Sequence, residues 1–240
     1  MKLTQLKSPN FSEKKRNIRQ IKLLILHYTG MQSARVSIKR LTSPKHKVSC
    51  HYLINREGKV FRMVEDNRVA WHAGKSKWGK FVNLNDKSIG IELVNKGHKF
   101  GYQKFSKKQI SALIQLCIKL KKKYRIKNHY ILGHSDIAPL RKSDPGEKFP
   151  WNLLKKKKLG IWNSSTKQSF YVGKLNKKSF RKFFFKNLYK IGYRYFFVNR
   201  PSKNDIKVIK AFQRRYSQTK IDGKIDQKIL KISHFLATRT

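Results

Sequence analysis

The stretch SIGIELV, residues 88–94, alternates apolar side chains with small or polar ones, and this period of two is typical of a β-strand. Its large apolar residues fall on one face of the strand, and Ser88, Gly90 and Glu92 fall on the other. Gly90 is small enough to leave room for a substrate or a metal site beside it. The stretch therefore predicts a strand that turns Glu92 away from its apolar face.

Two further predicted strands end on a histidine. Residues 21–26 (IKLLIL) form a short apolar run that stops at His27, and residues 129–133 lead directly to His134. After His134 the stretch GHSDIAPLRKSDPGEKFPW, residues 133–151, contains too many prolines and glycines for a helix to run through it. We expect a shaped loop that holds polar side chains at the end of the strand.

A hairpin and a long helix complete the first part of the chain. Residues 50–55 and 59–64 flank a turn-like break at 56–58 and predict a hairpin. Residues 106–124 predict an amphipathic helix that begins at the N-cap Ser106. The positions at helical spacing are Ile110, Leu113, Ile114, Cys117, Ile118 and Lys121. Strands that alternate with a long helix predict an α/β layered fold.

The character of the sequence changes after Trp151. We predict a domain over residues 1–158, a linker at 159–166 (LGIWNSST) and a small helical domain over 166–240. Residues 204–216 repeat apolar side chains at helical intervals, and a closing helix is predicted through Leu230.

The composition predicts a folded but very basic protein. The 240 residues are 39% hydrophobic, with 58 lysines and arginines against 12 acidic residues, a formal charge of +46. Such a surface attracts polyanions, including nucleic acid, anionic lipid or an acidic cell-wall polymer. A lysine bias of the whole proteome explains the charge equally well, so the charge alone does not identify a partner.

Cysteines and targeting signals add little. Cys50 and Cys117 lie far apart, belong to no metal-binding pair and are expected to be buried free thiols. The first 20 residues lack the apolar run of a signal peptide, and no segment has the ~18 apolar residues of a membrane span. We expect a cytoplasmic monomer without a membrane span, and keep a periplasmic or wall-associated location as the alternative.

Five polar residues lie at strand ends or in the adjoining loop: His27, Glu92, His134, Lys142 and Asp144. Two histidines and one carboxylate are a sufficient ligand set for a catalytic zinc ion, which keeps a fourth position open for water. Such an ion suggests metal-assisted hydrolysis. Glu92 is then the candidate proton shuttle, and Lys142 the cation that stabilises a developing oxyanion. Taken singly, each histidine is by default a surface or core residue, so only the joint arrangement carries weight.

These residues fall in stretches that resemble the zinc-dependent N-acetylmuramoyl-L-alanine amidases of the type 2 fold, a fold shared with peptidoglycan recognition proteins. The matching stretches are LILHYTG (24–30), SCHYLINREGKVFRMVEDNRVAWHAG (49–74), NDKSIGIELVN (85–95) and GHSDIAPLRKSDPGEKFPW (133–151). They occur in family order over residues 20–155. The last stretch, with its order of His, Lys and Asp before Pro-Gly, is highly specific.

The resemblance implies a mixed central β-sheet flanked by helices, with one Zn²⁺ ion held by His27, His134 and Asp144 and with Glu92 and Lys142 as the catalytic pair. It also implies cleavage of the amide between N-acetylmuramic acid and L-alanine in peptidoglycan or muropeptides, and hence a role in cell-wall degradation or recycling. By the same resemblance, three residues line the substrate groove: Tyr28, His72 and Ala73.

The C-terminal stretch IKAFQRRYSQTKIDGKID resembles the small helical peptidoglycan-binding domain often attached to such amidases. A generic helix pair explains it equally well. Two other functions remain open at this point: a peptidoglycan-binding module without catalysis, and a basic nucleic-acid-binding protein. The first class typically lacks a full ligand set, and no DNA- or RNA-binding motif supports the second, so we expect no specific nucleic-acid partner.

Overall fold

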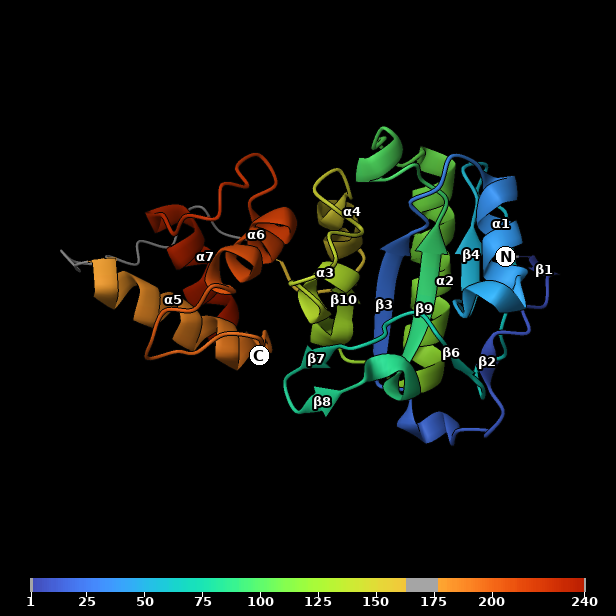
Figure 1. Cartoon of the computed structure of the whole chain (residues 1–240), viewed down its shortest axis with the longest axis horizontal. Coiled ribbons are helices and arrows are strands. Elements are labelled where there is room, and N and C mark those ends of the chain that lie inside the picture. The colour runs from blue at the N-terminus through green and yellow to red at the C-terminus, as the bar shows by residue number, and fades with distance from the viewer. Residues whose placement is uncertain (1, 163–176, 240) are drawn as a thin grey trace.

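The computed structural model describes residues 2–162 and 177–239, and Figure 1 gives the arrangement of their elements. A six-stranded sheet forms its centre, with the strand order β1-β5-β4-β9-β3-β10. Neighbouring strands run parallel except β4 and β5, so the sheet is mixed. The strands are Leu3–Gln5 (β1), Val60–Arg62 (β5), Tyr52–Ile54 (β4), Ser88–Leu93 (β9), Leu23–Tyr28 (β3) and Ile131–Gly133 (β10).

Seven helices and two short ribbons surround the sheet in the described part of the chain. The ribbons pair Phe11–Ser12 (β2) with Val69–Ala70 (β6), and Lys77–Trp78 (β7) with Phe81–Val82 (β8). The helices are Ala34–Thr42 (α1), Lys107–Tyr124 (α2), His134–Ile137 (α3), Trp151–Lys156 (α4), Lys177–Ile191 (α5), Asp205–Tyr216 (α6) and Gln227–Ala237 (α7). Mixed sheet and flanking helices confirm the predicted fold class. No helix of the described residues combines the length and apolarity that crossing a bilayer requires.

The predicted strands and hairpin are present with shifted ends. The hairpin forms with Tyr52 opposite Arg62 and Ile54 opposite Val60. The strand after residue 21 extends through His27 to Tyr28, because both residues continue the parallel pairing with β9. The predicted strand at 129–133 begins only at Ile131, since residues 128–130 form a 3₁₀ turn.

The two faces of β3 point into different hydrophobic clusters. Leu24 and Leu26 join the cluster beneath α2, whereas Leu23 and Ile25 join the cluster on the opposite face. Because side chains alternate along a strand, His27 shares the face of Leu23 and Ile25. The parallel register pairs His27 with Glu92 of β9, so both side chains reach the same end of the sheet on that face.

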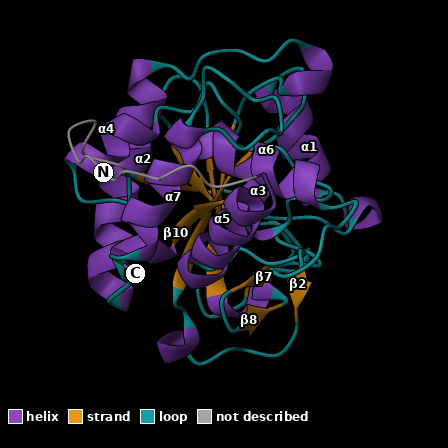
Figure 2. Ribbon diagram, turned by 90° about the vertical axis from the view of Figure 1, so that its left-hand side faces the viewer, coloured by secondary structure: helices purple, strands orange, loops and turns teal. Residues whose placement is uncertain are grey.

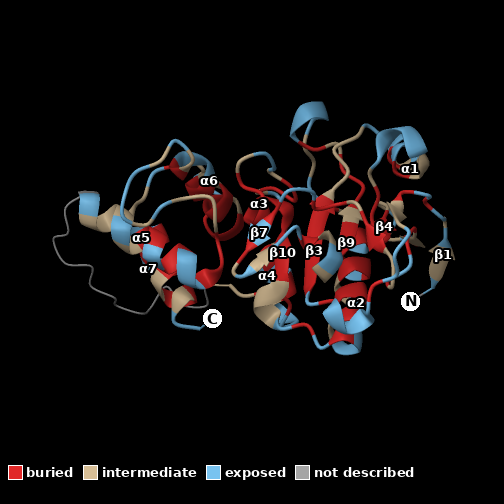
Figure 3. Cartoon of the chain, turned by 60° about the horizontal axis from the view of Figure 1, so that its bottom comes forward, coloured by how far each residue is buried: buried red, intermediate tan, exposed pale blue. Residues whose placement is uncertain are grey.

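Helix α2 covers the other face of the sheet, and Figure 3 shows its exposed outer side against the buried strands. The Ser106 hydroxyl caps the helix by accepting a hydrogen bond from the Gln109 N–H at 3.1 Å, as predicted. The buried stripe differs in part from the predicted one, because Ile118 is 46% exposed and Leu116 takes its place against the sheet. The stripe consists of Ile110, Ala112, Leu113, Leu116, Cys117, Leu120 and Tyr124. Cys50 and Cys117 are both buried and free, as expected.

Helices α5, α6 and α7 form a small bundle beside β10, and Figure 2 looks at the molecule from that side. Gln213 of α6 is fully buried and holds the turn of the Asp-Gly motif: its side-chain amide donates to Asp222 Oδ1 at 2.8 Å and accepts from the Gly223 N–H at 2.8 Å. Gly223 has φ +76°, a left-handed conformation that favours glycine. These contacts explain why the predicted stretch combines Phe-Gln with Asp-Gly.

The bundle shares its hydrophobic core with the sheet. One continuous cluster of buried residues contains Leu23 and Ile25 of β3 together with Phe184 of α5 and Phe212 of α6. The predicted linker is described only up to residue 162, and its residues 163–166 lie outside the described residues. The predicted domain limits therefore stay a prediction, while the packing shows that the helical part is seated on the sheet part.

Candidate active site

Three predicted ligands from separate segments converge at the carboxyl ends of β3 and β10. His27 Nδ1 lies 2.9 Å from His134 Nδ1 and 3.1 Å from Asp144 Oδ2. His134 Nδ1 lies 3.0 Å from the same carboxylate oxygen. All three side chains are buried. Among the described residues, this is the group of histidine, cysteine and acidic side chains whose ligand atoms are close enough to hold a metal ion.

The backbone fixes the tautomer of His134. Its Nε2 lies 3.1 Å from the carbonyl oxygen of Ala73, and a carbonyl can only accept a hydrogen bond. The ring proton of neutral His134 therefore sits on Nε2, and Nδ1 presents a lone pair to His27 and Asp144. Metal-binding histidines use such outer contacts to orient the ligand nitrogen.

A chain of hydrogen bonds fixes the tautomer of His27 in the same way. The Ser88 hydroxyl donates to the carbonyl of Leu84 at 2.6 Å, so its oxygen accepts from His72 Nε2 at 3.3 Å. His72 Nδ1, which then carries no proton, accepts from His27 Nε2 at 3.0 Å. The Nδ1 atom of His27 is left with a free lone pair that faces His134.

Gly90 creates the space for this chain. A Cβ atom at Gly90 would lie 2.3 Å from Cγ of the His72 ring, which is closer than real contacts allow. The glycine on the face of Glu92 therefore makes room for the imidazole of His72, whereas the sequence suggested room for a substrate or the metal site itself.

The electrostatics of the cluster favour a bound cation. Burial, reinforced by the neighbouring His134, lowers the pKa of His27 to about 4. Burial alone would raise the pKa of Asp144, but the positive charge and Nδ1–H donors that His134 and His27 carry when their rings are protonated outweigh burial and hold this pKa below its ordinary value. When both rings are neutral, the cluster offers two Nδ1 lone pairs and one carboxylate oxygen at mutual distances near 3 Å. A donor set of this kind fits a divalent metal ion.

Glu92 lies on the strand next to His27 and has a different environment from Asp144. Its Oε2 atom is buried and makes no hydrogen bond within the described residues. Burial, with a further contribution from the negative charge of Asp144, raises the pKa of Glu92 to about 8, although Lys142 opposes the shift. A carboxyl group whose pKa is near the working pH can both accept and donate a proton.

These groups open into a cavity of about 860 Å³. Glu92, His134 and Asp144 line its floor, and Lys142 and Tyr28 line it as well. Lys142 is exposed, and its positive charge acts on both Glu92 and His27. A cavity of this volume can hold a small-molecule ligand, and it brings Glu92 and Lys142 to the same space.

The residues predicted to contact substrate take up three different positions. Tyr28 is at the rim, where its hydroxyl lies 2.8 Å from His98 Nδ1 and 3.2 Å from Ser143 Oγ. His72 lines the cavity and contacts His27, and Ala73 is fully buried with its carbonyl oxygen against His134. A substrate contact at these positions stays a prediction.

Two residues that support the site were missed from the sequence. Asn85 Oδ1 accepts hydrogen bonds from the backbone N–H groups of His72 at 3.2 Å and Ala73 at 2.7 Å. The Arg141 guanidinium donates to the carbonyls of Ala73 and of Lys75, the latter at 2.9 Å. Both residues hold the turn that orients the two histidines. Their position inside the matching stretches or next to Lys142 was a signal, but nothing in the spacing revealed their partners.

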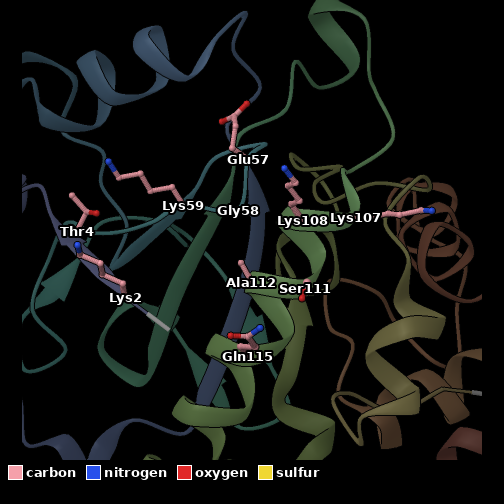
Figure 4. A pocket seen from close by; sticks show the side chains of 10 residues that line it. All are labelled: Lys2, Thr4, Glu57, Gly58, Lys59, Lys107, Lys108, Ser111, Ala112 and Gln115. Atoms are coloured by element: carbon pink, nitrogen blue, oxygen red, sulfur yellow. The ribbon is translucent and has the colours of Figure 1, made fainter.

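A second cavity, of about 820 Å³, lies at the far edge of the sheet and differs chemically from the first. Figure 4 shows the residues that line it, which come from β1, the β4–β5 turn and the start of α2. Four of them are lysines, and Glu57 is the one acidic residue of the lining. No histidine or cysteine lines it, so it lacks the ligands of a catalytic metal.

Comparison with known proteins agrees with this geometry. Residues 17–147, more than half of the chain, match the family model described as N-acetylmuramoyl-L-alanine amidase. The chain is 33% identical over 232 residues to N-acetylmuramoyl-L-alanine amidase AmiD of Escherichia coli K12, which covers 90% of this chain and 82% of AmiD. It is 34% identical over 165 residues to 1,6-anhydro-N-acetylmuramyl-L-alanine amidase AmpD of Haemophilus influenzae, covering 61% of this chain and 87% of AmpD.

Solved structures resemble nearly the whole chain. The complex of E. coli AmiD with anhydro-N-acetylmuramic acid-L-Ala-D-gamma-Glu-L-Lys superposes with a TM-score of 0.81 at 31% identity, covering 95% of this chain and 92% of AmiD. AmpDh3 of Pseudomonas aeruginosa with anhydromuramic pentapeptide has a TM-score of 0.82 at 29% identity, covering 95% and 94%. Both similarities extend through the C-terminal helices.

Proposed function

The chain belongs to the N-acetylmuramoyl-L-alanine amidase family, and from this premise we propose that it cleaves the amide between N-acetylmuramic acid and L-alanine in peptidoglycan or its muropeptides. We further propose one zinc ion as its cofactor, held by His27, His134 and Asp144. The observation that carries the proposal is the convergence of two histidine Nδ1 atoms and one carboxylate oxygen within 3.1 Å of one another. Zinc accepts this mixed nitrogen and oxygen set with a fourth position open.

A bound zinc ion would supply Lewis acidity, which stabilises negative charge on the amide oxygen and makes water a better nucleophile. Glu92 moves the proton in this proposal: its carboxylate takes a proton from the attacking water and returns it to the leaving nitrogen of L-alanine. The buried, unpaired Oε2 atom of Glu92 and its pKa of about 8 support both steps. Lys142, a cation on the same cavity, stabilises the developing oxyanion.

The substrate class follows from the relatives and from charge. Both structural neighbours are complexes with anhydro-muramyl peptides, and AmpD carries the anhydro sugar in its name. The cavity rim is basic, with Lys39, Arg40 and Lys99 beside Lys142. Stem peptides of muropeptides contain carboxylates, which a basic rim attracts more strongly at low salt. We propose that the C-terminal helices add contact with the wall polymer.

The decisive experiment incubates the purified full chain with defined muropeptides and with intact sacculi, with and without a chelator, and identifies the products by mass. We expect free stem peptides, loss of cleavage on chelation and recovery when Zn²⁺ is returned. His27→Ala and Asp144→Ala should lose bound metal together with activity. Glu92→Ala should keep the metal and lose turnover by about 10²- to 10⁴-fold. Full turnover in the Glu92 variant would remove this residue from the mechanism.

A further inference from the structure

A buried ion pair joins the C-terminal bundle to the turn that carries His134. Arg215 of α6 and Asp136 of α3 are each 1% exposed, and Arg215 Nη1 lies 2.5 Å from Asp136 Oδ2. Tyr193, which follows α5, donates from its hydroxyl to Asp136 Oδ1 at 2.6 Å. Both oxygens of this carboxylate are thus bound by the C-terminal part of the chain, although the residues are 57 and 79 positions away.

Asp136 in turn fixes the backbone on both sides of His134. Its Oδ2 atom accepts a hydrogen bond from the Gly133 N–H at 2.8 Å, directly before the histidine. Helix α3 is a single turn that runs from His134 to Ile137, so Asp136 is part of the same turn. A shift of the Asp136 carboxylate therefore moves the backbone that aims His134 Nδ1 at the metal-binding cluster.

Arg215 also holds the segments before and after this turn. Its Nη2 atom donates to the carbonyl of Ile131 in β10 at 3.0 Å. The guanidinium carbon lies 4.2 Å from the ring centre of Trp151, where α4 begins. One side chain from the bundle thus contacts the strand that enters the loop at residues 133–151, the acidic residue within it and the helix that leaves it.

Without Arg215 the carboxylate of Asp136 would be a buried charge without a counter-charge. Removing one partner of a buried pair is strongly unfavourable, because the remaining charge has lost both water and its partner. Hydroxyl and amide donors from Tyr193 and Gly133 do not neutralise it. The carboxylate would turn toward solvent and take α3 with it.

We propose that Arg215 is a positioning residue for the metal site: through Asp136 it orients His134, so that docking of the C-terminal bundle sets the affinity for the metal ion. This inference rests on the proposed function, because it requires that His134 binds the metal. It gives the bundle a role in the active site that is separate from any contact with the cell wall.

The full-length chain offers a matched control for the test. Arg181 Nε pairs with Asp205 Oδ2 at 2.8 Å, a largely buried arginine–aspartate pair that lies within the C-terminal bundle. Arg181→Met and Arg215→Met each remove one guanidinium from such a pair. The metal-stripped variants are titrated with Zn²⁺ against a chromophoric chelator, and their thermal unfolding is recorded in parallel.

We expect Arg215→Met to weaken zinc binding by about 10- to 100-fold, the range typical of residues that orient a metal ligand. Arg181→Met should lower the melting temperature and leave zinc affinity within about two-fold of the wild type, since its partner Asp205 begins α6 and is not part of the turn that carries His134. The double variant Arg215→Met with Asp136→Asn should recover most of the zinc affinity. A neutral amide tolerates burial beside Gly133 better than an unpaired carboxylate.

Three results would overturn or redirect the inference. Equal zinc affinity in Arg215→Met and Arg181→Met would make Arg215 a residue for stability alone. A double variant no better than Arg215→Met would show that Asp136 does not transmit the effect. Failure of the wild type to bind zinc would refute the proposed function itself. If Arg215→Met does not fold, Arg215→Lys keeps the charge but loses the forked contacts, and a zinc affinity unchanged from the wild type would then refute the inference.

Discussion

The loop at residues 133–151 contains two buried carboxylates whose surroundings differ in one respect. Asp136 has its counter-charge within the chain, since Arg215 lies directly against it. Asp144 faces the Nδ1 atoms of His27 and His134, which present lone pairs when the two rings are neutral. One carboxylate is therefore balanced by an arginine of the chain, while the other belongs to a group of side chains that could hold a metal ion. A buried charge indicates function when the chain does not neutralise it.

The largest effect is expected where the cluster itself is broken. Asp144→Asn replaces a charged ligand by a weak neutral one, so zinc affinity and turnover should both fall by on the order of 10³-fold or more. Bound metal is measured after dialysis, and turnover by release of stem peptide. Asp66→Asn is the matched control, because Asp66 is similarly buried but is bound by Tyr52, Tyr124 and Lys123, none of which is a predicted metal ligand. Wild-type metal content in Asp144→Asn would end the comparison.

Substitution of Glu92 tests how a carboxyl group whose buried Oε2 atom has no hydrogen-bonding partner among the described residues affects the stability of the fold. Its pKa rises from the ordinary 4.5 to about 8 in the folded chain, so between these values the folded state binds a proton that the unfolded state releases. Stability of the metal-free protein should therefore fall as the pH rises through this window. Glu92→Gln removes this dependence and should gain on the order of 1–4 kcal/mol over the wild type at pH 9, with little difference near pH 4.5.

Urea unfolding in the presence of chelator measures this difference at both pH values. Both proteins contain the same histidines, so the difference between them isolates the contribution of Glu92. A constant difference between Glu92→Gln and wild type across the window would show that Glu92 keeps an ordinary pKa.

Gly90→Ala tests whether the orientation of His27 contributes to metal binding by the cluster that contains Asp144. The added methyl group must displace the His72 ring, whose Nδ1 atom orients His27. We expect zinc affinity to fall by about 10-fold with folding retained. Ile89→Val, on the opposite face of the same strand, should cost about 0.5–1.5 kcal/mol of stability and leave zinc affinity unchanged. Equal zinc binding by both variants would remove His72 from the support of the site.

The smallest effect is expected at a charge pair that water already screens. Lys123 Nζ lies 3.1 Å from Asp66 Oδ2, but the lysine side chain is 52% exposed and two tyrosine hydroxyls also hold Asp66. Lys123→Ala should therefore cost only about 0.2–1 kcal/mol in urea unfolding. A loss as large as that of Arg215→Met would contradict the distinction between buried and exposed partners.

The sequence was sufficient to predict which residues meet at the strand ends, but not which side chains orient them. His27 and His134 follow apolar runs, and parallel strands bring such ends together, so their meeting was predictable. The fold class and the N-cap at Ser106 also follow from local patterns. The relay from His27 through His72 to Ser88 depends on side-chain rotation, which has no period in the sequence.

The packing of the C-terminal bundle against the sheet could likewise not be predicted from the sequence. Arg215 is one of 58 lysines and arginines, and nothing in its neighbourhood distinguishes it from the others. Its partner Asp136 is 79 positions away, and such a pair is fixed only when both helices pack against β10. The stripe of α2 was misjudged at Ile118 for a related reason, because helical spacing gives the width of an apolar face but not its centre.

The shared hydrophobic cluster of sheet and bundle has a consequence for how such enzymes can diversify. The bundle of this chain is not an independent unit, since its contact with the sheet includes Phe212 and Arg215 on one side and Leu23 and Asp136 on the other. Separating these residues by recombination would expose apolar surface and leave a buried charge without its partner. In this chain, a change of the C-terminal part therefore calls for matching changes in the turn that carries His134.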